Sequence, residues 1–222
     1  AVQAAVGAVS YVGIKLDQEH IELKMSEHLP QRAQAVARLA ELGIANPASN
    51  DQVAAELLRR GARVGDEIGQ IPLTEKAQKP SVRADVLERL PRTDSLTPVI
   101  DALLTFRHHQ RVLSTYLRPY HLLCTRGDGR MRSTVYTLQA DTGRFSCVHE
   151  NLQNIPTHGG IRECYICDPG DLFIDADLSG VEVAVLAALS QDEVLLELVA
   201  SGQQLHKIIA KQVYGPNHTP RQ

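Results

Sequence analysis

The chain has 222 residues, of which 43% are hydrophobic and 22% are charged, and its formal net charge is −3. These values exclude an intrinsically disordered protein, and the length suffices for one large domain or two small ones with buried cores. No run of about 18 apolar residues occurs, so we expect no membrane-spanning helix and no membrane partner. Four cysteines are too few for a disulfide framework and indicate reduced thiols in a cytoplasmic protein. The start at Ala1 and the end at Gln222 indicate a fragment of a longer protein.

Helices are expected throughout the first half of the chain. Pro30 precedes the first predicted helix and Pro119 ends the last, because proline favours the first turn of a helix and interrupts its interior. Ser49 or Asn50 can cap the second helix and Ser81 the third, through a side-chain oxygen that accepts a backbone N–H. The last helix carries a stripe of apolar residues at helical spacing. The predicted helices span residues 31–42, 50–60, 81–90 and 95–117, with a loop over 62–80.

The second half begins with short apolar runs separated by glycine-rich turns, a pattern that favours strands, and continues with helical patterns. The predicted strands span residues 121–125, 131–138, 162–167 and 172–178, and the predicted helices span 181–189, 193–200 and 204–214. Residues 139–160 have little periodicity and are expected to form an ordered loop. The predicted fold class is therefore α+β, with a helical region over 1–119 followed by a small antiparallel sheet with packed helices over 120–222.

Charge is distributed unevenly along the chain. Six arginines lie between residues 107 and 132, where Asp128 is the only acidic residue, whereas residues 163–197 hold nine acidic residues and no Lys or Arg. A basic tract followed by an acidic one is typical of a protein that holds a polyanion beside a cation site. Two ordinary solvated surfaces would give the same pattern, and composition alone favours them.

The segment from Asp175 to Glu182 carries the strongest chemical signal. Asp175 and Asp177 would project from the same face of the predicted strand, because side chains alternate along a strand. A carboxylate beside a backbone carbonyl suits Mg²⁺, which prefers oxygen ligands. The alternative is structural: Ser179 and Glu182 match a capping box, and Asp177 would stabilise the N-terminus of the following helix. Spacing alone favours the structural interpretation.

A C-x-x-C pair, Cys164 and Cys167, could belong to a zinc site. Its odd separation would direct the two sulfurs to opposite faces of a strand, so small buried hydrophobic residues are the better interpretation. His206 lies in a helical pattern, where a lone histidine is more often structural than functional. Patterns typical of P-loops, dinucleotide-binding folds, zinc proteases and serine hydrolases do not occur.

Polar residues in the predicted loop could contact nucleic acid. Arg144 follows a glycine and could reach a phosphate or a base edge, and the amides of Asn151, Gln153 and Asn154 could read acceptors in a minor groove. The same residue types also occur in ordinary turns, where their side chains bind nearby backbone groups.

Taken together, these segments resemble the family A DNA polymerases, the family that includes bacterial DNA polymerase I. Thr142–Ser146 and Asn151–Pro156 are similar to the family's T-G-R-L-S and N-L-Q-N-I-P signature, and Asp177–Val183 is similar to its motif A, usually D-Y-S-Q-I-E-L-R. Leu186–Asp192 and Gly202–His206 are similar to the A-H-L-S-x-D and G-x-D-I-H elements that follow. Their order and spacing also fit, and the resemblance extends over most of the chain.

The resemblance implies a helical thumb over 1–119 that grips duplex DNA, joined to the first part of a polymerase palm over 120–222. It implies template-directed addition of deoxynucleotides to a primer 3′ end in the full-length enzyme, by phosphoryl transfer with two Mg²⁺ ions, in DNA replication or repair. The implied partners are primer-template DNA and deoxynucleoside triphosphates, and the implied oligomeric state is a monomer.

The resemblance also implies roles for individual residues. Asp177 and the carbonyl of Leu178 would hold Mg²⁺, and Glu182 would be the steric gate that excludes a ribose 2′-hydroxyl. The implied catalytic residues are Asp177 and Glu182. The implied nucleotide-binding residues are Ser179, Gly180, Glu182 and His206. The implied DNA-binding residues are Arg144, Asn151, Gln153 and Asn154.

Several positions depart from the family pattern. Leu178 stands where Tyr is usual, Gly180 where Gln is usual, Ala184 where Arg is usual and Gln204 where Asp is usual, so nucleotide discrimination could differ. The family's nucleotide-binding lysine and second metal-binding aspartate are not in these 222 residues, so we expect this chain alone not to polymerise. Two other functions stay open: a catalytically inert remnant that binds duplex DNA, and a Mg²⁺-dependent phosphohydrolase.

Overall fold

The computed structural model describes residues 2–157, 159–176, 178, 180–202 and 205–215. Contacts within the chain divide it into two units, Ala1–Asp171 and Leu172–Gln222. Helices and a small antiparallel sheet are both present, so the predicted α+β class is confirmed.

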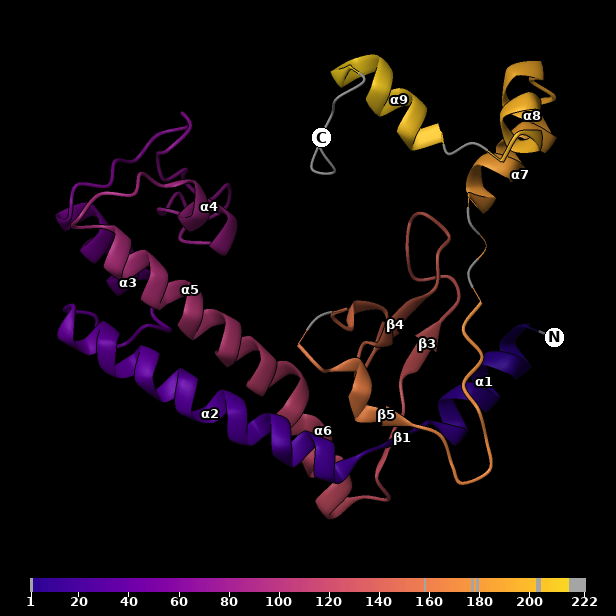
Figure 1. The fold of residues 1–222 in the computed structure, drawn as a ribbon, viewed down its shortest axis with the longest axis horizontal. Coiled ribbons are helices and arrows are strands. Elements are labelled where there is room, and N and C mark those ends of the chain that lie inside the picture. Colours follow the sequence, from indigo (N-terminus) through magenta and orange to yellow (C-terminus); the bar gives the residue numbers. More distant parts are fainter. Residues whose placement is uncertain (1, 158, 177, 179, 203–204, 216–222) are drawn as a thin grey trace. The chain divides into compact units, whose positions relative to one another are not determined.

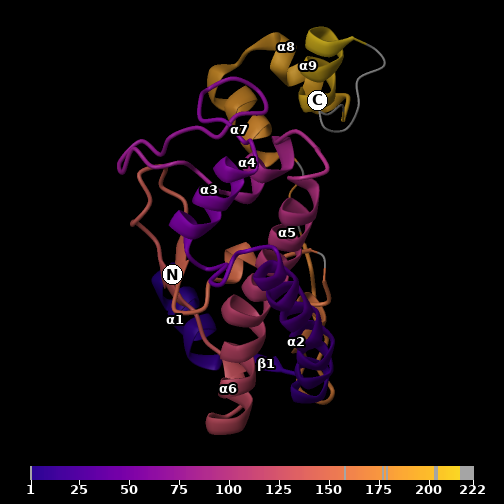
Figure 2. The ribbon, with the colours of Figure 1, turned by 90° about the vertical axis from the view of Figure 1, so that its left-hand side faces the viewer.

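Two long helices, α2 (Gln18–Glu41) and α5 (Thr97–Arg111), lie side by side in the first unit (Figures 1 and 2). Asp17 caps α2, because its side chain accepts a hydrogen bond from the backbone N–H of His20 at 3.0 Å. One hydrophobic core joins the C-terminal half of α2 and most of α5 to the shorter helices α3 (Asn50–Arg59) and α4 (Ala84–Arg89). Fully buried side chains in this core include Leu39, Leu57, Leu87, Ile100 and Leu103.

The buried carboxylate of Glu56 fastens α3 to the segments around it. Glu56 accepts hydrogen bonds from Arg59 at 2.8 Å and from Arg60 at 2.6 Å. Arg60 also donates to the backbone carbonyl oxygens of Leu42 and Ser95, each at 2.9 Å. Hydrogen bonds from Arg59, together with those from Arg60, lower the pKa of Glu56 to about 2, so this carboxylate stays charged at neutral pH.

A π-helical segment, Val112–Leu117, connects α5 to α6 (Arg118–Arg126), so the chain stays helical through Pro119. Pro119 lies in the first turn of α6, directly after the π-helical segment. Proline has no N–H to donate, and at this position no hydrogen bond of the helix interior is lost. The predicted helix end at Pro119 and the predicted strand over 121–125 are therefore wrong. A second core surrounds the π-helical segment and includes Ile21, Leu113, Tyr116 and Tyr120.

The three-stranded antiparallel sheet has β1 (Ile14–Leu16) at its centre, between β2 (Arg130–Met131) and β5 (Tyr165–Ile166). Gly13 precedes β1 with a φ of +68°, and a Cβ there would lie 2.7 Å from the carbonyl oxygen of Met131, so only glycine fits this approach.

A separate two-stranded antiparallel pair follows the sheet. It joins β3 (Thr134–Tyr136) to β4 (Ser146–Val148), with Val135 opposite Cys147. The helix α1 (Val2–Val12), which precedes the sheet, was not predicted.

The second unit contains α7 (Val181–Ser190), α8 (Glu193–Ala200) and α9 (Leu205–Tyr214), which confirms the three predicted helices. Asp192 caps α8 by accepting a hydrogen bond from the N–H of Leu195 at 2.9 Å. Among the described helices of both units, none combines the length and the apolar character needed to cross a membrane.

Other predicted boundaries were right or wrong for local reasons. Ser49 caps α3 as predicted, and its side chain accepts from the N–H of Gln52. Ser81 does not cap α4, which begins at Ala84 after Arg83 without a side-chain cap. The first predicted helix begins thirteen residues earlier than expected, at Gln18 instead of residue 31, and Pro30 lies inside it.

Two predicted strands are also corrected. Residues 162–164 form a 3₁₀ turn, so the predicted strand over 162–167 is reduced to β5. The predicted strand over 172–178 is wrong for the residues the structure describes there, 172–176 and 178, which have no strand pairing. Leu172 and Ile174 are almost fully exposed, and an extended segment without a partner strand does not form a sheet.

Candidate nucleic-acid interface

Hydrogen bonds of Gln153 connect the two polymerase-like loop segments, Thr142–Ser146 and Asn151–Pro156. Its amide Nε2 donates to the carbonyl oxygen of Phe145 at 2.7 Å, and its Oε1 accepts from the N–H of Cys147 at 3.2 Å. Asn151 in turn caps the short 3₁₀ helix Leu152–Asn154, because its side chain accepts from the N–H of Gln153 at 2.9 Å. The amides of Asn151 and Gln153 therefore hold residue 145 and the 151–154 segment in one arrangement.

The side chains predicted to bind DNA lie on the surface of the first unit. Arg144, Asn151, Gln153 and Asn154 are all exposed. Arg144 directly precedes Phe145, so the Gln153 hydrogen bonds position the backbone that carries its guanidinium. The structure thus brings the four predicted DNA-binding residues together in one part of the first unit.

A hollow of about 320 Å³ lies beside these residues, between the π-helical segment and residues 149–154. It offers a guanidinium, hydroxyl groups and side-chain amides, which are the groups that proteins use to contact phosphates and base edges. The residues that line it are Arg111, Thr115, Tyr116, Tyr120, His149, Glu150, Asn151 and Asn154.

Tyrosines anchor this hollow to the core, and sequence reasoning missed them. Tyr116 donates its hydroxyl hydrogen to the carbonyl oxygen of Asn154 at 2.8 Å. The hydroxyls of Tyr120 and Tyr165 lie 2.5 Å apart, and Tyr165 also contacts the sulfur of Met131 at 3.5 Å. Burial raises the pKa of Tyr120 to about 12, and burial followed by the Tyr120 hydrogen bond raises that of Tyr165. Both hydroxyls stay neutral at physiological pH, so the network is fixed by hydrogen bonds.

Glu150 is the acidic group of the hollow. Burial raises the pKa of its carboxyl, and its backbone carbonyl accepts a hydrogen bond from the hydroxyl of Ser133.

The basic tract of residues 107–132 is partly neutralised within the fold. Arg107 donates to the carbonyl oxygen of Val82, Arg130 pairs with Asp168, and Arg132 pairs with Asp128 at 2.6 Å. The remaining three arginines of the tract are exposed, and one of them lines the hollow; they are Arg111, Arg118 and Arg126. Two arginines of the tract therefore pair with aspartates, Arg107 donates to a backbone carbonyl, and the other three arginines are exposed to solvent.

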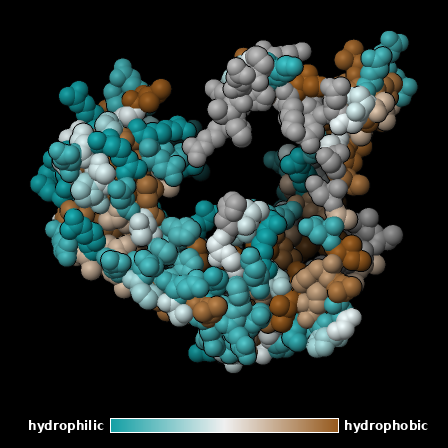
Figure 3. All heavy atoms as spheres, in the orientation of Figure 1, coloured by the Kyte–Doolittle hydropathy of each residue, from teal (hydrophilic) through white to brown (hydrophobic). Residues whose placement is uncertain are grey.

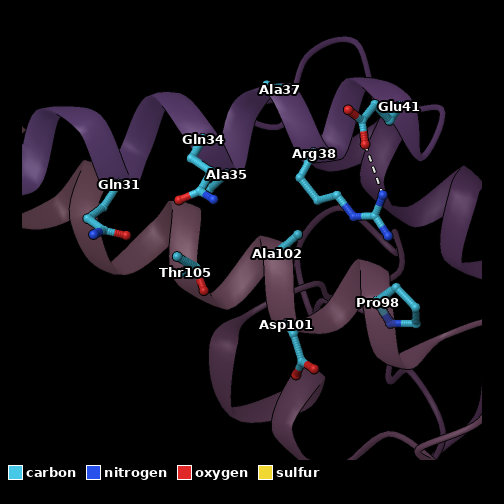
Figure 4. Close-up of a pocket in the computed structure, with 10 residues that line it drawn as sticks. All are labelled: Gln31, Gln34, Ala35, Ala37, Arg38, Glu41, Pro98, Asp101, Ala102 and Thr105. Atoms are coloured by element: carbon cyan, nitrogen blue, oxygen red, sulfur yellow. Dashed lines mark hydrogen bonds and ion pairs between the residues drawn. The ribbon is translucent and has the colours of Figure 1, made fainter.

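A second, open groove of about 590 Å³ runs between α2 and α5 (Figure 4). Its charged residues are paired: Arg38 with Glu41 at 2.9 Å, and Asp101 with Arg92 at 2.5 Å. Hydrophilic side chains cover most of the visible face over these helices (Figure 3). Since both signs of charge are present, this groove does not favour a polyanion.

The residues predicted around the metal lie in the second unit. Asp177 and Ser179, and the side chain of His206, lie outside the described residues. Leu178 is exposed, and Glu182 is exposed in the first turn of α7. Gly180, with a φ of +68°, is the N-cap of α7 and has no side chain to cap it; the predicted capping box between Ser179 and Glu182 involves a residue outside the described ranges.

The four cysteines are free thiols in the structure. Cys147 and Cys164 are buried, and burial raises the pKa of Cys164 to about 11, so its thiol is protonated. Within the described ranges, no cysteine belongs to a group of side chains arranged to hold a metal ion. The interpretation of Cys164 as a small buried hydrophobic residue is supported, and a zinc site at the C-x-x-C pair is not.

The chain is similar in sequence to known DNA polymerases. The model of DNA polymerase family A matches residues 16–221. DNA polymerase I of Chloroflexus aurantiacus is 34% identical over 215 residues, which cover 93% of this chain and 22% of that protein. The thermostable DNA polymerase I of Thermus aquaticus is 31% identical over 223 residues, which cover 96% of this chain and 26% of that protein.

A solved structure resembles the whole chain. The POL domain of Pol1 from M. smegmatis, in complex with DNA primer-template and dNTP, superposes with a TM-score of 0.73 at 28% identity, over 99% of this chain and 39% of that one. The chain thus spans about a quarter of the length of the curated relatives named above. Because the family model matches most of its residues, the chain belongs to DNA polymerase family A.

Proposed function

We propose that this chain is the part of a DNA-directed DNA polymerase that holds primer-template DNA and carries one of the two metal-binding carboxylates. The complete enzyme would add deoxynucleotides to a primer 3′ end in DNA replication or repair. The observation that carries the proposal is the similarity of 99% of the chain to a polymerase domain solved with primer-template and dNTP. We propose further that the enzyme is monomeric and, because its substrate is DNA, cytoplasmic.

The surface of the first unit supports a DNA-binding role. Arg144, Asn151 and Asn154 would contact the primer end and the template, while Gln153 holds their two segments together. Preformed segments lose little conformational freedom on binding, so their binding energy is retained. Arg111 would add a phosphate contact from the opposite wall of the hollow.

The second unit would contribute the chemistry. Family A polymerases depend on metal ions, and we propose that the ion is Mg²⁺. The donors offered here, the carboxylate of Asp177 and the carbonyl oxygen of Leu178, are the hard oxygen ligands that Mg²⁺ prefers. When bound, the ion would activate the primer hydroxyl and neutralise phosphate charge. Glu182 would exclude a ribose 2′-hydroxyl, and Ser179, Gly180 and His206 would contact the nucleotide.

The division into a thumb over 1–119 and a partial palm over 120–222 stays a proposal about function. Contacts divide the chain elsewhere, after Asp171, and α6 crosses Pro119 without a break. In our proposal, the helical region over 1–119 grips the duplex while the 142–156 segments meet the primer end.

The test is primer extension by the complete enzyme carrying Asp177→Ala. We expect loss of extension with Mg²⁺ and nearly unchanged affinity for duplex DNA, because the carboxylate holds metal and not DNA. Asp171→Ala changes an exposed carboxylate that lies six positions earlier in the sequence; this variant is the matched control and should extend at the wild-type rate. Extension by Asp177→Ala at the wild-type rate would refute the metal assignment. Tight binding without extension by the unaltered complete protein would instead support the inert DNA-binding remnant.

A further inference from the structure

Three histidines from the two long helices meet in the first unit. His28 on α2 is buried, while His109 on α5 is half-buried and His108 is exposed. Their ring centroids lie 4.8 Å apart for His28 and His109, 5.0 Å for His108 and His109, and 5.9 Å for His28 and His108. One nitrogen from each ring lies within 4.8 Å of the others, the only such group of metal-binding side chains over the described ranges.

The arrangement keeps at least part of the cluster neutral. Nδ1 of His28 lies 2.7 Å from Nδ1 of His109, so one ring must donate a proton and the other must accept it through a lone pair. Burial, followed by the charge of His108, lowers the pKa of His28, and burial followed by the charges of His28 and His108 lowers that of His109. Neutral imidazoles are the form that binds metals.

The charged groups near the three histidines do not explain why the three rings lie together. Glu27 favours protonation of His28 and Lys24 opposes it, but these two residues are paired with each other at 2.9 Å. Arg32, one turn further along α2, donates to the side chain of Gln110 at 2.5 Å. A histidine pair joined by a hydrogen bond accounts for His28 and His109, and it leaves the position of His108 unexplained.

We propose that His28, His108 and His109 form a binding site for a divalent transition-metal ion such as Zn²⁺. Three imidazole nitrogens without a thiolate or carboxylate favour zinc, copper, nickel or cobalt over magnesium. Zn–N bonds of about 2.0–2.1 Å place tetrahedral ligand atoms about 3.4 Å apart. The nitrogens of His28 and His109 need to separate by less than about 1 Å to reach that spacing. Water would occupy the fourth position.

Metal binding here would link the two long helices. His28 lies near the middle of α2, and His108 and His109 lie near the end of α5, just before the π-helical segment. An ion bound to both helices would stabilise their packing in the folded state and have no equivalent site in the unfolded chain. The proposed site shares no residue with the proposed Mg²⁺ site.

The test is titration of the full chain with Zn²⁺ and Co²⁺ near neutral pH, in excess Mg²⁺ so that hard-oxygen sites are occupied. We expect binding of one equivalent by calorimetry, a cobalt spectrum without a thiolate charge-transfer band, and a higher melting temperature with Zn²⁺. His108→Gln alters the exposed ring, so the variant should fold normally and lose affinity by about tenfold or more.

His121→Gln is the matched control, because His121 is a half-exposed histidine on α6 that pairs with Glu22, outside the cluster. It should bind Zn²⁺ with wild-type affinity. His28→Gln should also lose binding, with circular dichroism to check its fold. Absence of binding by the wild-type chain, or equal affinity in wild type and His108→Gln, would overturn the proposal. A thiolate band in the cobalt spectrum that persists in His108→Gln would assign binding to cysteines and would also overturn it.

Discussion

The side chain of Gln153 offers the most direct test of how the fold prepares the proposed DNA surface. Gln153→Ala removes the hydrogen bond to the carbonyl oxygen of Phe145 at 2.7 Å and the one from the N–H of Cys147 at 3.2 Å. Cys147 is only 9% exposed, so its N–H has little access to water as a replacement partner. The substitution therefore both weakens the link between the two segments and leaves a buried donor unsatisfied.

The expected cost follows from these two contacts. Each hydrogen bond contributes about 0.5–1.5 kcal/mol net, and an unsatisfied buried donor costs about 1–3 kcal/mol. Because Gln153 itself is exposed, we expect Gln153→Ala to lower the free energy of unfolding by about 1–3 kcal/mol. In a chain of this size, each kcal/mol corresponds to a decrease in melting temperature of about 2–4 °C.

The same change should weaken DNA binding, because Arg144 is carried by the backbone that Gln153 holds. We expect the complete enzyme with Gln153→Ala to bind primer-template about tenfold more weakly, equivalent to about 1.4 kcal/mol. Denaturant unfolding of the full chain measures the first effect, and fluorescence anisotropy with labelled primer-template measures the second.

Gln18→Ala is the control, since it removes one exposed hydrogen bond, to Glu22 at 2.8 Å, far along the chain from the loop. It should change stability by no more than about 0.5 kcal/mol and leave DNA affinity unchanged. If Gln153→Ala matches this control in both measurements, the reasoning about Gln153 is wrong. If it loses stability and keeps full DNA affinity, the link from loop position to DNA binding is wrong.

Three further predictions concern other parts of the molecule. The pKa of Glu56 is lowered to about 2, so its ion pairs stabilise the fold above the ordinary value of 4.5 and this stabilisation disappears as the pH falls towards 2. Glu56→Gln should cost about 1–3 kcal/mol at neutral pH and flatten that acid dependence in urea unfolding; an unchanged pH profile would contradict the assignment. Tyr120→Phe removes the partner of the Tyr165 hydroxyl and should cost about 1–2 kcal/mol by thermal unfolding, whereas wild-type stability would mean that the hydroxyl pair contributes nothing. Glu182→Ala in the complete enzyme should admit ribonucleotides in primer extension, and unchanged sugar selectivity would count against the proposed gate.

Local chemistry in the sequence predicted several features correctly. Ser49 caps α3 because its hydroxyl accepts a nearby N–H, and this bond depends on residues within one turn of each other. The helices α7 and α8 begin and end close to their predicted residues, and α8 is likewise capped by a nearby side chain, that of Asp192. The polymerase-like segments were recognisable because their residue order alone is distinctive, and the family comparison confirms that recognition.

Boundaries that depend on distant contacts were predicted poorly. Pro30 lies within α2 because buried residues on both sides of it, Ile21 and Leu39 among them, pack into the cores of the first unit. The apolar run at Leu172–Ile174 has the composition of a strand, yet no strand pairs with it among the described residues. A segment forms a stable strand only when it hydrogen-bonds to a neighbouring strand, and the composition of the segment does not reveal whether such a neighbour exists.

By itself, the sequence determined the fold class, the caps of helices such as α3, and the motifs that identify the family, because each of these depends on residues close together in the chain. Only the tertiary structure decided that Gln153 holds residues 145 and 147 in place, that Arg130 and Arg132 of the arginine tract pair with aspartates, and that His28 meets His108 and His109. These last residues are about 80 positions apart in sequence, and α2 and α5 bring them together only when their apolar faces pack.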